Sequence, residues 1–142
     1  MTPSPPQNLK ALVLWVLWFC MVCSIPLYQF MLGHGWLRRD DARSAMQNPI
    51  FWLSAGLLAV AAIVRWVFIP QTINSRTLLI LLVIGLAQSE SVEFYSIFLF
   101  PPDMPQTKMG LFALSLLSAL QFAPFYARNA DPARLPGDRA RR

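Results

Sequence analysis

Four long stretches of apolar residues constrain the fold of this chain more than any other feature of its sequence. They cover approximately residues 9–32, 50–69, 77–100 and 109–126. An α-helix rises about 1.5 Å per residue, so about 20 apolar residues are enough to cross the ~30 Å hydrocarbon core of a bilayer. We therefore predict an integral, multi-pass membrane protein with one transmembrane domain over residues 9–126.

The connections between these stretches are short, and short connections make consecutive helices run antiparallel. Prolines flank the second and third stretches at positions 49, 70, 101 and 102, as is typical of helix boundaries. The predicted fold class is all-α, an up-down-up-down four-helix transmembrane bundle. Residues 1–8 and 127–142 are predicted to be short disordered tails.

The distribution of basic residues predicts the orientation in the membrane. Eight Lys and Arg residues lie on the side that holds both termini and the second connection, and four lie on the other side. The positive-inside rule then places both termini in the cytoplasm, and we expect a bacterial inner membrane. The net charge of +5 comes from residues in tails and loops beside apolar stretches, so the predicted partner is anionic lipid and not nucleic acid.

The C-terminal tail has two interpretations. It holds five arginines, at positions 128, 134, 139, 141 and 142, and too little apolar surface to fold alone. In the first interpretation it is a solvated segment that contributes to the positive-inside bias. In the second it docks on acidic lipid headgroups or on a partner protein.

Classical enzyme chemistry finds no support in the sequence. There is no glycine-rich phosphate-binding loop, and His34 is the single histidine, so neither a Ser-His-Asp set nor a multi-histidine metal site can be assembled. Cys20 and Cys23 form a Cys-x-x-Cys inside the first apolar stretch, where an apolar helix disfavours thiolate. We interpret them as small hydrophobic residues and predict no metal, no cofactor and no enzymatic activity.

The third stretch carries the residues with the clearest chemistry. Glu90 lies near its middle, and Glu93 follows about one helical turn later. At 100° per residue, both glutamates share one arc of the helix with Gly85, Ser89 and Ser96, while a second polar stripe holds Gln88, Ser91 and Tyr95. We expect the arc to face neighbouring helices, and the candidate proton- or ion-binding residues are Glu90, Glu93, Ser89, Gln88 and Tyr95.

The energetics favour a protonatable site. Two ionised glutamates at the centre of a membrane helix cost roughly 5–7 kcal/mol on insertion scales. We therefore expect at least one neutral carboxyl at pH 7 and a pair that titrates as a coupled unit. In the alternative interpretation, the glutamates only join helices through hydrogen bonds to polar residues of the other stretches, for which the candidates are Ser115, Ser118, Gln121, Ser54 and Gln29.

The segment Ser89-Glu90-Ser91-Val92-x-x-Tyr95-Ser96-Ile97 resembles the carboxylate helix of the proteolipid c subunit of rotary ATP synthases. It is also similar to a stretch in small bacterial four-helix membrane proteins of unknown function. The resemblance covers 15 to 20 residues and implies that Glu90 is the ion carrier. The chain departs from a c subunit in having Glu93, a first helix rich in Trp and Phe, and no glycine repeat.

Two functions remain as expectations. In the first, the chain is a small membrane protein whose glutamate pair takes part in proton or cation movement, alone or as a homo-oligomer. In the second, it is a non-catalytic accessory or assembly subunit of a larger membrane complex, and the glutamates are interhelical contacts.

Overall fold

The computed structural model describes residues 7–33, 41, 44–72 and 74–125. Within these ranges every regular element is a helix, as the all-α prediction requires. The predicted C-terminal tail, most of the predicted N-terminal tail and most of the first connection lie outside the described residues. The interpretations of the tail arginines are therefore neither supported nor contradicted.

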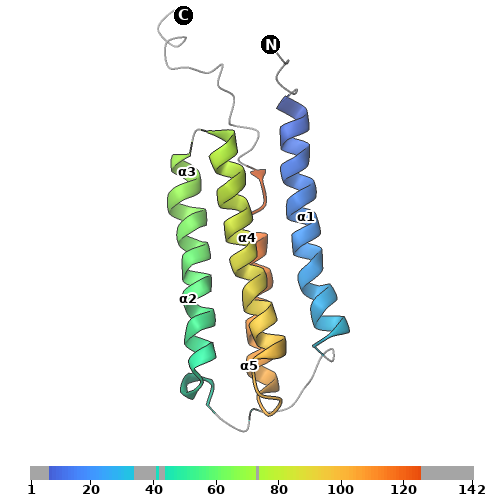
Figure 1. The fold of residues 1–142 in the computed structure, drawn as a ribbon, viewed down its shortest axis with the longest axis vertical. Helices are drawn as coiled ribbons and strands as arrows, with labels where there is room; N and C mark the ends of the chain where they lie inside the picture. The colour runs from blue at the N-terminus through green and yellow to red at the C-terminus, as the bar shows by residue number, and fades with distance from the viewer. Residues whose placement is uncertain (1–6, 34–40, 42–43, 73, 126–142) are drawn as a thin grey trace, which may run out of the picture.

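Four long helices follow one another along the described chain. They are α1 (Gln7–Met31), a continuous helix made of α2 (Pro49–Ile63), η2 (Val64–Phe68) and α3 (Ile69–Gln71), then α4 (Ser75–Phe98) and α5 (Pro105–Leu120). One short turn of 3-10 helix, η1 (Ala45–Gln47), precedes α2. Successive long helices run in opposite directions along the long axis (Figure 1).

The helix starts follow local sequence chemistry. The Asn48 side chain accepts a hydrogen bond from the Ile50 N–H at 3.0 Å, and Asn74 does the same for the Arg76 N–H at 2.9 Å. Asparagine is a preferred N-cap because it satisfies a backbone donor that the first helical turn leaves free. The second helix ends at Gln71, one residue after Pro70 and two residues after the predicted end of the apolar stretch. The wider π-helical turn of η2 ends at Phe68, two residues before this proline, which has no N–H to donate.

The fourth helix differs most from its predicted range of 109–126. It begins at Pro105 and ends at Leu120. Asp41 caps its start, as described below, and the chain turns at Gln121 and Phe122 before reaching Pro124. Apolarity alone does not mark this end, because the residues after the turn are apolar as well and pack back against the helices.

Helices α4 and α5 form the centre of the arrangement. They pack against each other, and both also pack against α1 and against α2. In Figure 1, α2, α4 and α1 lie side by side, with α5 behind α4. The packing resembles a rhombus with α4 and α5 across its short diagonal, so polar residues on the inner face of α4 are enclosed by helices.

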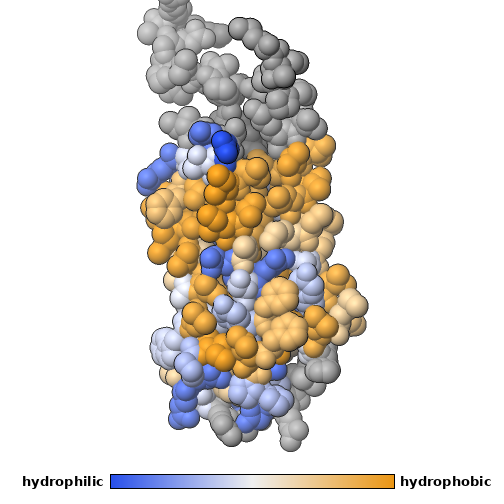
Figure 2. Space-filling view, viewed as in Figure 1, coloured by the Kyte–Doolittle hydropathy of each residue, from blue (hydrophilic) through white to orange (hydrophobic). Residues whose placement is uncertain are grey.

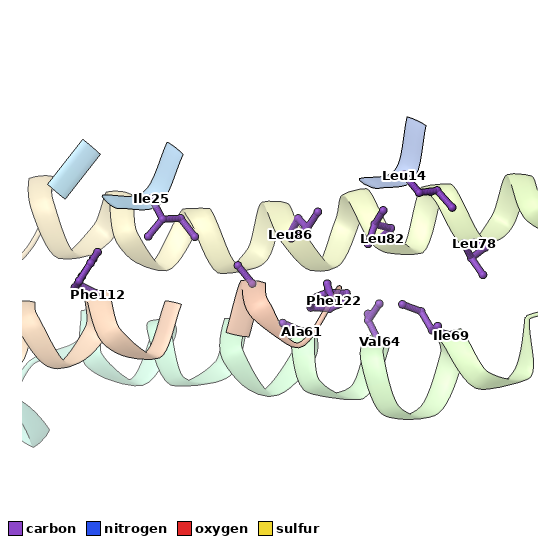
Figure 3. Close-up of a cluster of buried hydrophobic side chains, with 11 residues drawn as sticks. Leu14, Ile25, Ala61, Val64, Ile69, Leu78, Leu82, Leu86, Phe112 and Phe122 are labelled. Atoms are coloured by element: carbon purple, nitrogen blue, oxygen red, sulfur yellow. The ribbon is translucent and has the colours of Figure 1, made fainter. Parts of the chain in front are cut away.

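The main apolar core lies between these four helices toward the end where α4 begins. Leu82, Leu86 and Phe122 are completely buried in it, next to Ala61 and Val64 of the second helix (Figure 3). The ring of Phe122 occupies the space beside Gly85, where a Cβ atom would overlap it. A second cluster of Val92, Phe100, Met104 and Leu111 closes the opposite end.

Three of the helices are long and apolar enough to cross a membrane. These segments are Ala11–Met31, Pro49–Gln71 and Arg76–Phe98. Many of their large apolar side chains are exposed, including Phe19, Phe30 and Trp52, and Figure 2 shows a broad apolar surface. This is the surface expected of a protein that faces lipid.

Candidate functional site

A buried row of polar side chains runs along the contact between α4 and α5. Ser89, Glu93 and Ser96 are four and three residues apart, so they share one face of α4, and all three are fully buried. Ser115 and Ser118 of α5 face them and are also buried. We call these five residues the α4–α5 seam. The sequence prediction that the polar arc of this helix faces its neighbours is confirmed for Ser89, Glu93 and Ser96.

The serines of the seam are well satisfied. Ser89 Oγ lies 2.8 Å from Ser118 Oγ and 3.1 Å from the carbonyl oxygen of Gly85. The Ser96 hydroxyl donates to the carbonyl oxygen of Lys108 at 3.1 Å. Such bonds hold two helices in register where lipid offers no hydrogen-bonding partner.

Glu93 is the exception, because its carboxyl group is poorly satisfied. The Ser115 hydroxyl lies 3.4 Å from its Oε2 atom, and the same hydroxyl lies only 2.8 Å from the Phe112 carbonyl oxygen. The Oε1 atom of Glu93 is buried without a hydrogen-bond partner among the described residues. A buried polar atom without a partner is rare in folded proteins, and an ion, a water molecule or a catalytic role commonly explains it.

Among the residues that the structure describes, no Lys or Arg is placed at the depth of Glu93 to neutralise a charge there. Lys108 lies seven residues before Ser115 on α5, which places its backbone about 10 Å away along the axis. Arg65 is near the opposite end, where its guanidinium donates to the carbonyl oxygen of Gln121. The carboxyl group of Glu93 is therefore buried among serine hydroxyls and apolar side chains.

Glu90 has a different environment from Glu93. It is only partly buried, and its carboxylate accepts a hydrogen bond from the Ser24 hydroxyl of α1. Glu93 instead meets Ser115 of α5. The two glutamates thus face different helix contacts, and Ser24 was not among the partners that the sequence suggested.

Of the remaining predicted site residues, only Ser89 lies beside Glu93 in the seam. Gln88 and Tyr95 are half-buried and lie on the outer side of α4 with Ser91. Helical periodicity separates these two groups, because positions 88, 91 and 95 lie roughly 100° or more from the centre of the buried face. The structure therefore brings Ser89 and Glu93 together and leaves Gln88 and Tyr95 outside.

A chain of hydrogen bonds leads from the seam to one end of the molecule. The Gln121 amide nitrogen lies 3.3 Å from Ser118 Oγ, and the Trp66 indole donates to the Gln121 amide oxygen at 3.0 Å. Ser118 in turn contacts Ser89, which lies one helical turn from Glu93. The apolar cluster that holds Val92 and Leu111 begins at the level of Glu93 and extends past Ser96 to Phe100 and Met104 at the other end.

Sequence reasoning missed the role of Asp41. Its carboxylate accepts from the Gln106 N–H at 2.7 Å and from the Thr107 N–H at 3.0 Å, and it also binds the Thr107 hydroxyl. It therefore caps α5 from a distant part of the chain, since Met104 offers no side-chain cap. Local spacing carries no signal for such a cap, because the two segments are about 65 residues apart.

Among the residues that the structure describes, no group of three or more His, Cys, Asp and Glu side chains is placed to hold a metal ion. Cys20 and Cys23 are free and exposed on α1. Comparison of the chain with protein-family models, curated proteins and solved structures found no match. The candidate site therefore rests on the geometry around Glu93 and Glu90.

Proposed function

We propose that this chain is a four-crossing membrane protein that binds a proton at Glu93 and takes part in proton or cation movement. The observation that carries the proposal is the fully buried Glu93 carboxyl group, whose Oε1 atom has no hydrogen-bond partner among the described residues. A carboxylate removed from water and from cations is strongly disfavoured relative to the neutral acid. The group is then a natural place for a proton to be taken up and released within the membrane.

The fourth crossing in this proposal is α5. Its 16 residues span about 24 Å, which is shorter than a ~30 Å hydrocarbon core. Local thinning of the bilayer accommodates a difference of this size at modest cost. The contact of α5 with α4, α1 and α2 supports this placement, and its exposed Leu114, Leu117 and Leu120 give it an apolar face suited to lipid.

The hydrogen bonds around the seam support a direction for proton exchange. Hydrogen bonds through Ser89, Ser118 and Gln121 lead from a point one helical turn from Glu93 to the end that holds Trp66. The opposite end is closed by the Phe100 and Met104 part of the second apolar cluster. In the proposed function, protons therefore reach Glu93 from the Gln121 end, which the basic residues predict to be cytoplasmic.

Carbodiimide labelling tests the proposal, since a hydrophobic carbodiimide modifies protonated carboxyls within membranes. Purified protein in liposomes is incubated with the reagent from pH 5 to pH 9, and the modified residue is identified by mass spectrometry. We expect adduct at Glu93 that forms more slowly as the pH rises, and none in Glu93→Gln. The matched control is Glu90→Gln, which removes the neighbouring carboxyl and leaves Glu93 in place.

Proton flux in the same liposomes provides the functional measurement. We expect Glu93→Gln to reduce the flux of the wild-type protein at least tenfold. Absence of adduct at Glu93 over the whole pH range, together with unchanged flux in Glu93→Gln, would refute the proposal.

The contact between Glu90 and Ser24 favours the second function, an accessory or assembly subunit. It joins α1 to α4 and needs no proton transfer to do so. If this contact is the main role of the glutamates, Glu90→Leu should release the protein from its membrane complex, while Glu90→Gln, which keeps a hydrogen-bonding group, should retain it. Blue native electrophoresis of solubilised membranes distinguishes the two variants.

A further inference from the structure

The outer side of α4 carries polar side chains that none of the described helices covers. Gln88, Ser91 and Tyr95 are three and four residues apart, share one side of the helix, and are each partly exposed. We call these three residues the outer stripe. The Ser91 hydroxyl donates to the Ala87 carbonyl oxygen at 2.8 Å, but the side chains of Gln88 and Tyr95 have no hydrogen-bond partner within the described part of the chain.

The outer stripe lies at the depth of the membrane interior. Gln88 follows the first residue of α4 by 13 positions, or about 20 Å along a helix of about 35 Å. Figure 2 shows hydrophilic side chains interrupting the apolar surface at mid-height on this face. Hydrocarbon supplies no hydrogen bonds, so an amide and a hydroxyl at this depth call for a polar partner.

Small residues make the same side of α4 suitable for close helix contact. Ala87 is exposed and precedes Ser91 by four residues, which is the small-xxx-small spacing that lets two membrane helices approach closely. Polar side chains beside such a spacing strengthen the contact through interhelical hydrogen bonds. The outer stripe therefore combines the close approach and the hydrogen-bonding groups that a membrane helix interface needs.

We infer that the outer stripe binds the outer stripe of a second copy of this chain, forming a parallel homodimer through α4. All copies enter the membrane in one orientation, so a twofold axis along the membrane normal brings identical residues together at equal depth. Each group in the stripe is its own complement, because an amide or a hydroxyl both donates and accepts. Gln88 then pairs with Gln88 of the other copy, and the interface contains no charge.

The residues around the stripe agree with this occupant. Glu90 points toward α1 and Ser24. It therefore does not meet Glu90 of the other copy, whose negative charge would repel it. The second helix also exposes small residues, Gly56 and Ala59, but this patch has no hydrogen-bonding side chain that needs a partner. It is the competing surface for association, and it supplies the control for the test.

Cysteine cross-linking tests the inference in membranes of the expressing cell. Cys20 and Cys23 are replaced by Ala, and single cysteines are introduced as Ser91→Cys on α4 or Ala59→Cys on the second helix. Oxidation is expected to convert most of the Ser91→Cys protein into a disulfide-linked dimer and to leave Ala59→Cys monomeric. Adding Gln88→Leu to Ser91→Cys should lower the dimer yield at least fivefold, whereas Gln88→Asn should retain most of it.

Each other outcome overturns the inference. A Ser91→Cys protein that stays monomeric excludes α4 as the contact, and preferential linkage of Ala59→Cys assigns association to the second helix. A dimer yield that does not change in Gln88→Leu shows that the polar stripe does not hold the copies together. Glu93→Gln, placed in the Ser91→Cys background, should leave the yield unchanged, so the result is independent of the proposed proton site.

Discussion

The close contact between Gly85 and Phe122 makes Gly85→Ala the sharpest test of the packing. A Cβ atom at Gly85 would overlap the ring of Phe122, which is fully buried between α4 and the second helix. At Gly56 the same atom would meet nothing within 4 Å. Both glycines lie inside helices, so the gain in helix propensity from Gly to Ala, about 1 kcal/mol, applies to both.

The difference between the two variants isolates the steric cost. Adding a methyl group to a filled core typically costs about 1–3 kcal/mol, because side chains and backbone must shift. We therefore expect Gly85→Ala to have a free energy of unfolding about 1–3 kcal/mol below that of Gly56→Ala. Adding Phe122→Leu should reduce the cost of Gly85→Ala to below about 1 kcal/mol, because the smaller side chain leaves room for the methyl group.

Equilibrium unfolding in mixed micelles with increasing SDS, followed by the fluorescence of the five tryptophans, measures these free energies. If Gly85→Ala and Gly56→Ala unfold at the same SDS fraction, Phe122 does not occupy the space beside Gly85. A cost that persists unchanged in the presence of Phe122→Leu would point to a backbone effect at position 85.

Three further variants test other contacts, two through the free energy of unfolding and one through carbodiimide labelling. Asp41→Ala removes the cap of α5 and should lower the free energy of unfolding by about 0.5–2 kcal/mol, and Asp41→Asn should lower it less. Equal stability of Asp41→Ala and the wild-type protein would contradict the cap. Trp18→Phe deletes the 3.0 Å hydrogen bond from the indole to the Ala119 carbonyl oxygen and should lower the free energy of unfolding by about 0.5–1.5 kcal/mol. If amide hydrogens at that end of α5 exchange at the wild-type rate in this variant, the assignment is contradicted. Ser118→Ala should slow carbodiimide labelling of the proposed proton site, because it removes the hydrogen bond to Ser89. Ser89 keeps its own hydrogen bond to the Gly85 carbonyl oxygen. Labelling at the wild-type rate would exclude Ser118 from the proposed route of proton exchange.

The membrane character of the chain could be predicted because it depends on length and apolarity, which are local properties. The three spanning segments agree with the predicted stretches to within a few residues, and Asn48 and Asn74 cap the helices where the apolar residues begin. The second helix ends one residue after Pro70, whereas the π-helical turn before it has no signal in the sequence pattern. The fourth helix was placed too late because its start depends on Asp41, a residue far away in sequence.

The candidate site was predictable only in part. The 3.6-residue period correctly grouped Ser89, Glu93 and Ser96 on one face, and all three are buried. Periodicity does not say which neighbour meets each residue, so the expected pairing of Glu90 with Glu93 gave no hint of separate contacts with Ser24 and Ser115. The partners depend on the depth at which the helices align, which is set by packing over their whole length.

The arrangement of α1 has a consequence for how the protein is assembled during synthesis. This helix leaves the ribosome before α4 and α5, yet its main contacts are with those two helices, and the bond between Trp18 and Ala119 joins residues 101 positions apart. The first segment is therefore without its final neighbours until α4 and α5 have been synthesised. A chain that stops before α5 keeps three apolar segments but exposes the serines and Glu93 of α4 to lipid. We expect membrane proteases to degrade such a fragment, so only chains that include α5 should accumulate.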